Sequence, residues 1–549
     1  MTPTLSLAEE NAALDEARHA AAGKLVKLRN LDLVGAGADA LTAEYVSSVV
    51  SHAIEKLQNE LTVFGRIDDD ATWRIGLYGV EQRGDQLVID WRAPFAQAFY
   101  QAQFDEPMGL VRRVSYVGSI DELFIEDFTT SEVSGSSPLL NELSRNRSET
   151  MRAAVATLQS EQDDLVRQAP DSRMVVRGGP GTGKTVVGLH RAAWLVYNDR
   201  RVLSADSILV VGPTDRYLQY VASVLPTLGE AKVRQTTLER LLGPTSDVGA
   251  NADWPAILDR FEASMYNPTE VKIRFKRVKQ ADVAEILDRV ARSTLPWRAK
   301  RKGVESSFMR LTEMSAADVR EAVATVMPAC SARQAWKKLR TRSVLTALGL
   351  DADFIDAWLA VDEDGPLFDE LKARFEEAAT KYSHVIVDEA QDLTEMQLRA
   401  MARRSAGLTM VGDDAQTSVA GALGLREVAN RLEVTPDVLA TAYRMSAEIA
   451  DWLNAYAMSV DLPAVDLIGI RPTGVDVVEC TVDELAAHAE TIASTHDNWR
   501  QLDHGDVWSH KGIEYDAVLV DGTRMTPAEI YLAASRAAHQ LVVALPKRG

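Results

Sequence analysis

The apolar residues of the first seventy positions recur at intervals of three and four, the spacing of one face of an α-helix. Residues 6–30 are rich in alanine and carry this pattern loosely, and residues 41–64 carry it more clearly after a glycine-containing break. Two helices joined by a short break predict an antiparallel pair. The pair could project as an arm or pack flat on its own domain, and the pattern leaves both open.

From residue 72 to about 117 the pattern changes to short runs rich in β-branched and aromatic residues, separated by turn residues. Such runs predict strands and hence a small β-rich module. Between two of the runs stands Asp90-Trp91-Arg92-Ala93-Pro94-Phe95, a cluster to which the sequence assigns no chemistry. The expected strands are 73–80, 86–90, 97–103 and 111–117.

From about residue 146 onward, helical patterns alternate with short apolar runs. This alternation predicts an α/β fold, in which parallel sheets are flanked by helices. The predicted strands are 174–176, 208–211, 384–387, 408–411, 517–520 and 541–544.

The segment from about 240 to 375 reads as helical with no comparable strand, and so predicts a helical insertion. Within it, residues 271–302 are locally basic, with Ile273, Phe275 and Trp297 among the cations. Such a surface suits the phosphates and bases of a nucleic acid, but a solvated helix or hairpin face explains it equally well.

The composition limits the class of protein. A length of 549 residues exceeds one hydrophobic core and predicts two to four domains. The formal net charge of −20 argues against bulk affinity for DNA but leaves room for a local basic groove. Cys330 and Cys480 fit no metal spacing and favour a reducing compartment. With no signal-like segment and no long apolar run, a cytoplasmic location without membrane insertion is expected.

Residues 178–185 fit the pattern of a phosphate-binding loop. An apolar run (174–176) precedes them and a helical run follows, which is the context that such a loop requires and an ordinary glycine-rich turn does not. Lys184 is expected to reach the β- and γ-phosphates and Thr185 to ligate Mg²⁺. The loop consists of Gly178, Gly179, Pro180, Gly181, Thr182, Gly183, Lys184 and Thr185.

Asp388 and Glu389 directly follow the apolar run 384–387. A carboxylate at the end of a buried strand can hold Mg²⁺, and the next one can orient or deprotonate an attacking water. Acidic residues also cap helices at such places, so this pair alone is ambiguous. Together with the loop it predicts a nucleoside-triphosphate hydrolase with ATP and Mg²⁺ as cofactors.

Further segments lie where a nucleotide-driven motor needs them. Gln162 precedes the loop and offers both a donor and an acceptor to adenine. Gln416 follows a predicted strand and could sense the γ-phosphate and the attacking water. Tyr443-Arg444 supplies an aromatic face and a cation, Lys511-Gly512-Ile513-Glu514 precedes another strand, and Arg536 follows Ser535.

In order and spacing, these segments resemble the superfamily 1 helicases of the UvrD/Rep type. In that family two RecA-like lobes clamp ATP between them. The resemblance implies that Tyr443 stacks on the adenine that Gln162 reads and that Glu514 contacts the ribose. It further implies that Lys184, Thr185, Asp388, Glu389 and Gln416 act in hydrolysis, with Arg444 and Arg536 as arginine fingers from the second lobe.

More specifically, the chain resembles the HelD-like branch in Ile75-Gly76, residues 90–94, residues 159–162, Gly212-Pro213 and residues 224–230. That branch binds RNA polymerase and uses ATP to free it from nucleic acid. The implied division is a helical hairpin arm (1–66), a β-rich module (67–145), a first RecA-like lobe (146–240 and 376–430), a helical insertion in it (241–375) and a second RecA-like lobe (431–549).

Departures from the UvrD/Rep pattern narrow the expected function. Residues 417–422 hold none of the aromatic residues that stack on DNA bases in translocating relatives, and each lost stacking contact removes roughly 1–3 kcal/mol per base. The second lobe is too short for a large insertion. Ser535 replaces a more usual threonine, so slightly less efficient hydrolysis is expected. The break in the hairpin carries only Asp32 and Asp39 as acids. We therefore do not expect it to act as an acidic tip at a polymerase's catalytic Mg²⁺.

We therefore expect an ATP-driven motor that binds RNA polymerase, binds DNA only weakly and acts as a monomer. The alternatives are a 3′-to-5′ single-stranded-DNA translocase that acts in repair, and a non-enzymatic module whose binding is gated by ATP.

Overall fold

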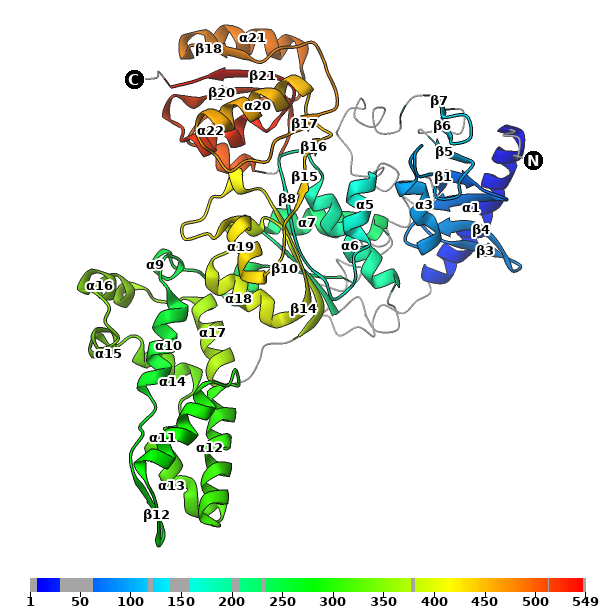
Figure 1. Cartoon of the computed structure of the whole chain (residues 1–549). Helices are drawn as coiled ribbons and strands as arrows, with labels where there is room; N and C mark the ends of the chain where they lie inside the picture. Colours follow the sequence, from blue (N-terminus) through cyan, green and yellow to red (C-terminus); the bar gives the residue numbers. More distant parts are fainter. Residues whose placement is uncertain are drawn as a thin grey trace.

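The computed structural model describes residues 7–29, 63–116, 122–135, 137, 158–198, 207–228, 233–376, 381–511 and 513–546. Figure 1 shows an N-terminal β-rich module beside a first α/β lobe, a second α/β lobe above it, and a long helical insertion below. Residues 41–62 of the second predicted N-terminal helix lie outside the described residues, and the first predicted helix is α1 (Leu7–Arg29). Among the described residues, no helix is both long and apolar enough to span a bilayer.

The N-terminal module is a seven-stranded sheet in the order β3-β4-β2-β1-β5-β6-β7. Helix α1 packs on it through Leu14 and Ala17. The carboxylate of Glu10, on the same helix, accepts hydrogen bonds from Arg66, Arg74 and Tyr116 of the sheet. The strands are β1 (Val63–Asp68), β2 (Thr72–Gly76), β3 (Val80–Gln82), β4 (Asp85–Asp90), β5 (Arg112–Tyr116), β6 (Leu123–Asp127) and β7 (Glu132–Ser134).

Three sequence predictions for this part of the chain are wrong. Residues 73–80 do not form one strand, since β2 ends at Gly76 and β3 begins at Val80. Residues 97–103 do not form a strand, because a 3₁₀ turn with Pro94 at its first position (Pro94–Ala96) leads directly into helix α3 (Gln97–Gln101). Phe99 of that helix packs edge-to-face on Phe64, with ring centroids 5.7 Å apart. Phe64 itself lies in β1 and not in a helix.

The unassigned Asp90–Phe95 cluster is the joint between the module and the first lobe. Arg92 is buried and donates to both carboxylate oxygens of Asp90, at 2.9 and 2.8 Å. Trp91 is fully buried, and its ring lies 5.3 Å from the ring of His190, on helix α6 (Lys184–Asn198). Arg167 donates to the carbonyl oxygen of Trp91 at 3.0 Å. The cluster therefore fixes the module to the helix that follows the glycine-rich loop.

Replacing Trp91 by alanine should lower the free energy of unfolding by about 3–5 kcal/mol, because a large buried ring is lost and a cavity remains. Urea unfolding, followed by far-UV circular dichroism so that the signal does not rely on the replaced tryptophan, measures the loss. Phe95→Ala, in the same turn but 45% exposed, is the matched control and should cost much less. Equal losses for the two variants would contradict the assigned role of Trp91.

The first lobe contains a six-stranded parallel sheet in the order β10-β9-β13-β14-β8-β15. Apolar side chains fill both faces, with Ile386 on the α6 side and Val385 and Val387 on the opposite side. Helices α5 (Ser160–Val166), α6, α7 (Asp215–Val224), α18 (Glu395–Arg404) and α19 (Gly424–Leu432) cover it. Its strands are β8 (Arg173–Gly178), β9 (Ile208–Gly212), β10 (Arg234–Thr237), β13 (Tyr382–Val387), β14 (Ser405–Gly412) and β15 (Asp437–Leu439).

The second lobe contains a four-stranded parallel sheet in the order β18-β21-β20-β19. Because β15 pairs with β8, the first sheet extends past the boundary predicted at residue 430. The strands of the second lobe are β18 (Val478–Cys480), β19 (Trp499–Leu502), β20 (Tyr515–Asp521) and β21 (Ala537–Ala544), with helices α20 (Ala447–Ser459), α21 (Leu485–Thr495) and α22 (Pro527–Ala534). A short pair, β16 (Thr441–Ala442) and β17 (Ile468–Gly469), lies where the chain enters the lobe.

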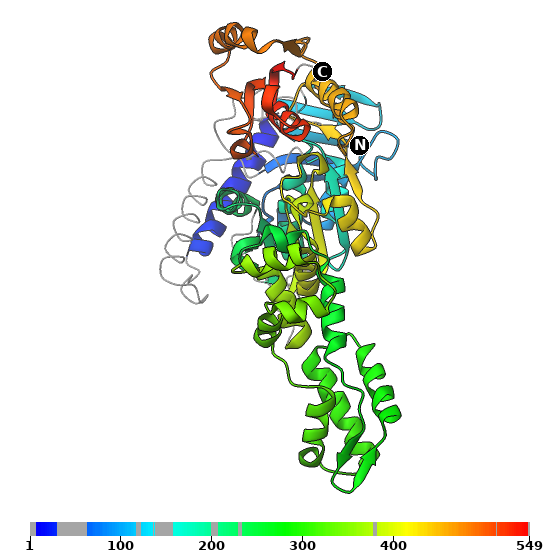
Figure 2. The same cartoon turned by 90° about the vertical axis from the view of Figure 1, so that its left-hand side faces the viewer.

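Between β10 and β13 the chain leaves the first lobe as an elongated helical body (Figures 1 and 2). Its core is built around Trp254, Trp297, Trp358 and Phe375. Its longer helices are α10 (Trp254–Ser264), α11 (Gln280–Ala291), α12 (Trp297–Thr312), α13 (Ala316–Val326), α16 (Ala352–Ala360) and α17 (Gly365–Phe375), and shorter ones are α8 (Leu238–Leu242), α9 (Asp247–Ala250), α14 (Ala332–Lys338) and α15 (Arg342–Ala347).

The insertion is not purely helical, because β11 (Val271–Ile273) and β12 (Lys276–Val278) form a hairpin at its far tip (Figure 1). Phe275, in the turn, is 76% exposed. Three cations of the basic segment pair with nearby acids: Arg274 with Asp318, Lys276 with Glu313 and Arg277 with Glu270. Farther along, Lys300 is buried against Glu262 and Trp297 is in the core.

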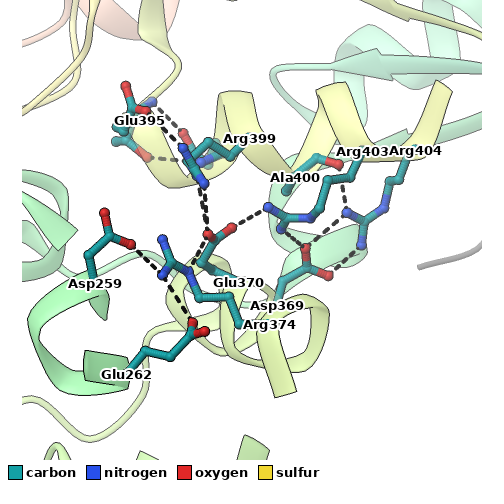
Figure 3. Close-up of polar contacts among 12 residues, drawn as sticks. Asp259, Glu262, Asp369, Glu370, Arg374, Glu395, Arg399, Ala400, Arg403 and Arg404 are labelled. Carbon is teal, nitrogen blue, oxygen red and sulfur yellow. Dashed lines mark hydrogen bonds and ion pairs between the residues drawn. The ribbon is translucent and has the colours of Figure 1, made fainter. Parts of the chain in front are cut away.

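An ion-pair network fastens the insertion to the first lobe (Figure 3). Glu370 on α17 is buried and accepts from Arg374 at 2.9 Å, from Arg399 of α18 at 3.1 Å, and from Arg403 of α18. Its neighbour Asp369 binds Arg403 and Arg404. Burial opposes ionisation, but the charges of Arg403, Arg399 and Arg374 outweigh it and hold the pKa of the Glu370 carboxyl below its usual value.

Glu370→Gln should destabilise the protein by about 3–5 kcal/mol at neutral pH, because it leaves buried arginines without their counter-charge. Since the pKa of Glu370 is lowered on folding, its contribution is complete above the unfolded-state pKa and is lost as the pH falls through the folded-state pKa. Denaturant unfolding at neutral and acidic pH tests both points. Glu363→Gln, at an exposed position, is the control, and an equal effect of the two changes would contradict the prediction.

Candidate nucleotide site

The glycine-rich loop joins the end of β8 to the start of α6, as its strand–loop–helix context predicts. Gly181 and Gly183 have positive φ angles of 73° and 84°, which glycine adopts without the steric cost of a side chain. A Cβ atom at Gly183 would also lie 2.5 Å from the side-chain nitrogen of Gln162. The ammonium of Lys184 donates to the carbonyl oxygen of Gly179 at 2.6 Å, so the lysine lies over the loop.

The two residues expected to hold Mg²⁺ are in direct contact. The hydroxyl of Thr185 donates to the Oδ2 atom of Asp388 at 2.7 Å. Burial and the neighbouring Glu389 raise the pKa of Asp388 to about 6. A hydroxyl and a carboxylate at the foot of a phosphate-binding loop are the hard oxygen ligands that Mg²⁺ prefers, so the donor set fits that ion.

Glu389 occupies an unusual position in the backbone. Its φ and ψ angles of 56° and 37° are left-handed, a conformation that costs energy for a residue with a side chain and is common at functional sites. Its Oε2 atom accepts from the side chain of Gln391 at 2.6 Å and pairs with Lys511 at 2.9 Å. Burial opposes ionisation, but mainly the charge of Lys511 keeps the pKa of Glu389 below its usual value.

Gln416 connects the lobes. It lies in the 3₁₀ turn η6 (Asp414–Gln416) after β14, and its amide nitrogen donates to Asp413 at 2.8 Å. Its amide oxygen accepts from Arg536 at 3.5 Å, across the boundary between the lobes. Arg536 is buried and also donates to the hydroxyl of Ser535 at 2.9 Å.

Arg444 and Glu514 lie on the second-lobe side of the glycine-rich loop. Their side chains pair at 2.6 Å. The backbone N–H of the preceding residue, Tyr443, donates to the carbonyl oxygen of Gly181 at 3.1 Å. A small cleft is lined by Gly181, Arg444, Met445, Glu514, Ser535, Arg536, Ala537 and Ala538. The structure thus places both candidate arginine fingers beside one another at the edge of the loop.

The two residues expected to hold adenine also lie together, but with their polar groups already engaged. Gln162 is buried in α5, accepts from the N–H of Gln159 at 3.1 Å and donates to the carbonyl oxygen of Thr182 at 3.0 Å. The hydroxyl of Tyr443 donates to Glu161 at 2.8 Å. In this arrangement Gln162 braces the loop. These two bonds use one of the two N–H donors and one of the two acceptor lone pairs of its amide.

Two known protein families match parts of this chain. The family described as DNA helicase IV HelD, N-terminal domain, matches residues 6–124. A family described as an AAA domain matches residues 162–284 and 305–422, which hold the loop and the Asp388–Glu389 pair. The chain belongs to the HelD-like superfamily 1 helicases.

Among solved structures, this HelD-like chain is similar to an arterivirus nonstructural protein 10 helicase in complex with DNA, at 12% identity and a TM-score of 0.30. The same viral helicase determined alone matches at 12% and 0.30, and the helicase of PRRSV at 13% and 0.28. The matches cover 70%, 70% and 71% of this chain but only 63%, 62% and 56% of the viral ones, so the chain spans less than two thirds of their length. No curated protein matches the sequence.

Sequence reasoning missed one residue of the HelD-like site. Lys511 stands in the Lys-Gly-Ile-Glu segment, for which the sequence and the resemblance predict a role only at Glu514. The structure places its ammonium on Glu389, on Asp392 and on the carbonyl oxygen of Gln416. Its position in the same short segment as Glu514 was the available signal that it belongs to the site. The sequence does not reveal its three partners, which all lie far away along the chain.

Proposed function

We propose that this protein is an ATP-driven, HelD-like motor that binds RNA polymerase in the cytoplasm and releases it from nucleic acid. The observation that carries the proposal is the arrangement across the lobes. Arg536 of the second lobe reaches Gln416 of the first, and Tyr443 binds the glycine-rich loop at Gly181. A hydrolysis site built from both lobes couples nucleotide turnover to their relative movement.

The residues of the first lobe would carry the chemistry. The loop amides and Lys184 would bind the phosphates, and Thr185 with Asp388 would hold Mg²⁺, which offsets the negative charge of the phosphates. Glu389 would take a proton from the attacking water, and Gln416 would orient that water. From the second lobe, Arg444 and Arg536 would stabilise the charge that develops on the transferred phosphoryl group.

Charge and surface composition support polymerase as the partner and count against a DNA track. A protein of net charge −20 is repelled by DNA and attracted by a basic nucleic-acid channel. The segment after η6, residues 417–422, presents Val419 but no aromatic side chain on which bases could stack. The match of the N-terminal module to the HelD family adds to this support.

Affinity purification of the tagged chain from its native cells tests the partner. RNA polymerase subunits should co-elute at low salt, and their absence would contradict the proposal. ATP hydrolysis should rise more with polymerase than with single-stranded DNA. Stimulation by DNA alone, together with strand separation of a tailed duplex, would instead establish the DNA translocase. A cellular role that survives Glu389→Gln would establish the ATP-gated binding module.

A further inference from the structure

Lys511 belongs to the second lobe, but its ammonium binds only first-lobe groups in the contacts that the structure describes. The residue lies between the 3₁₀ turn η8 (Val507–His510) and β20. Its Nζ atom is 2.9 Å from Glu389, 3.1 Å from Asp392 and 3.1 Å from the carbonyl oxygen of Gln416. The side chain is only 17% exposed, so the charge is largely removed from water.

The three acceptors come from two loops of the first lobe. Glu389 and Asp392 stand at the start and the end of the turn after β13, and Gln416 ends the turn after β14. A lysine that is held by three acceptors loses most of its rotamer freedom, and a largely buried ammonium persists only where such partners compensate its desolvation. One side chain therefore ties both catalytic loops to the second lobe.

The same ammonium fixes one oxygen of Glu389. Gln391, in the first lobe, also donates to that Oε2 atom, so the carboxylate is held from both lobes at once. Lys511 is absent from the small cleft beside the glycine-rich loop, where Arg444, Glu514 and Arg536 lie. Its contacts reach the groups that act on water and not the groups that would bind the nucleotide.

We propose that Lys511 is a positioning residue, which transmits the docking of the second lobe to Glu389 and to the Gln416 loop and so aligns them for hydrolysis only when the lobes are closed. The inference rests on the proposed ATPase function and adds a control of that same site. A purely structural ion pair would change stability without separating turnover from nucleotide binding.

The first test is Lys511→Met, which keeps the length of the side chain and removes its charge. We expect kcat for ATP to fall about 10- to 100-fold, because a catalytic group that is misplaced by about 1 Å loses up to about 10²-fold in rate. The Kd for a fluorescent ATP analogue should change less than about threefold, since the cleft beside the loop is untouched. Lys511→Arg should recover part of the rate.

Two matched variants separate positioning from general damage. Asp392→Asn removes one partner of the ammonium and leaves Glu389 intact, and should lower kcat in the same direction but less. Arg500→Met, at an exposed ion pair with Asp506 in the same lobe, should leave kcat unchanged. If Arg500→Met lowers kcat as much as Lys511→Met does, the proposal is overturned.

A second readout does not depend on hydrolysis. Fluorescence energy transfer between a label on α19 and a label on α21 reports how far the lobes are closed. The measurement uses protein in which Cys480 is replaced by serine, and no nucleotide is added. Lys511→Met should lower the closed fraction at least twofold. If the wild-type protein had no ATPase activity, the proposed function would be contradicted. The energy-transfer experiment would still test whether Lys511 holds the two lobes together. Unchanged closure, or unchanged or faster turnover, in Lys511→Met overturns the positioning role.

Discussion

Replacing Arg536 by alanine is expected to lower kcat for ATP hydrolysis by about 10³–10⁵-fold, the effect of losing an arginine finger. The guanidinium is buried, comes from the second lobe and reaches Gln416 of the first. Its charge is therefore available to the transferred phosphoryl group only when the lobes are together. Steady-state phosphate release measures the loss.

Arg524→Ala is the control for Arg536→Ala, because Arg524 is an exposed cation of the same lobe and should be dispensable. Arg536→Lys keeps the charge but not the planar fork, and should recover only a small part of the rate. If Arg536→Ala turned over ATP within a factor of ten of the wild type, the arginine would not act on the phosphates.

Replacing Lys184 by alanine is expected to reduce turnover by at least about 10²–10³-fold, which abolishes activity in an ordinary assay. The ammonium lies over the loop that is to hold the phosphates, where it donates to the carbonyl oxygen of Gly179. Arg173→Ala, at the exposed start of β8, changes a cation of the same strand and loop region and should have little effect. Turnover retained by Lys184→Ala would refute the site assignment.

The central strands of both parallel sheets could be predicted from the sequence, but the edge strands could not. The six predicted apolar runs lie in β8, β9, β13, β14, β20 and β21, each with a neighbour on both sides. Such strands are covered by helices on both faces and read as continuous hydrophobic runs. The edge strands β10, β15, β18 and β19 are short or polar, as in Arg234-Gln235-Thr236-Thr237, and carry no comparable signal.

The candidate site shows the same division between local and distant information. The glycines, Lys184 and Thr185 can be recognised from the sequence because one short segment holds them all. The contact of Thr185 with Asp388 follows once the loop after β8 and Asp388 after β13 lie at the same edge of one parallel sheet. Lys511 is different, because its three partners come from two other loops and another lobe. The buried Asp90–Arg92 joint was visible as an odd cluster, but its partner His190 was not.

The most direct test of the motor is a single-round assay of a stalled RNA polymerase complex that carries a labelled transcript. With Mg²⁺ and ATP, the wild-type protein should release the transcript, while Glu389→Gln should bind the polymerase and release little. Equal release by the two proteins, or release that does not depend on ATP, would contradict an ATP-driven motor.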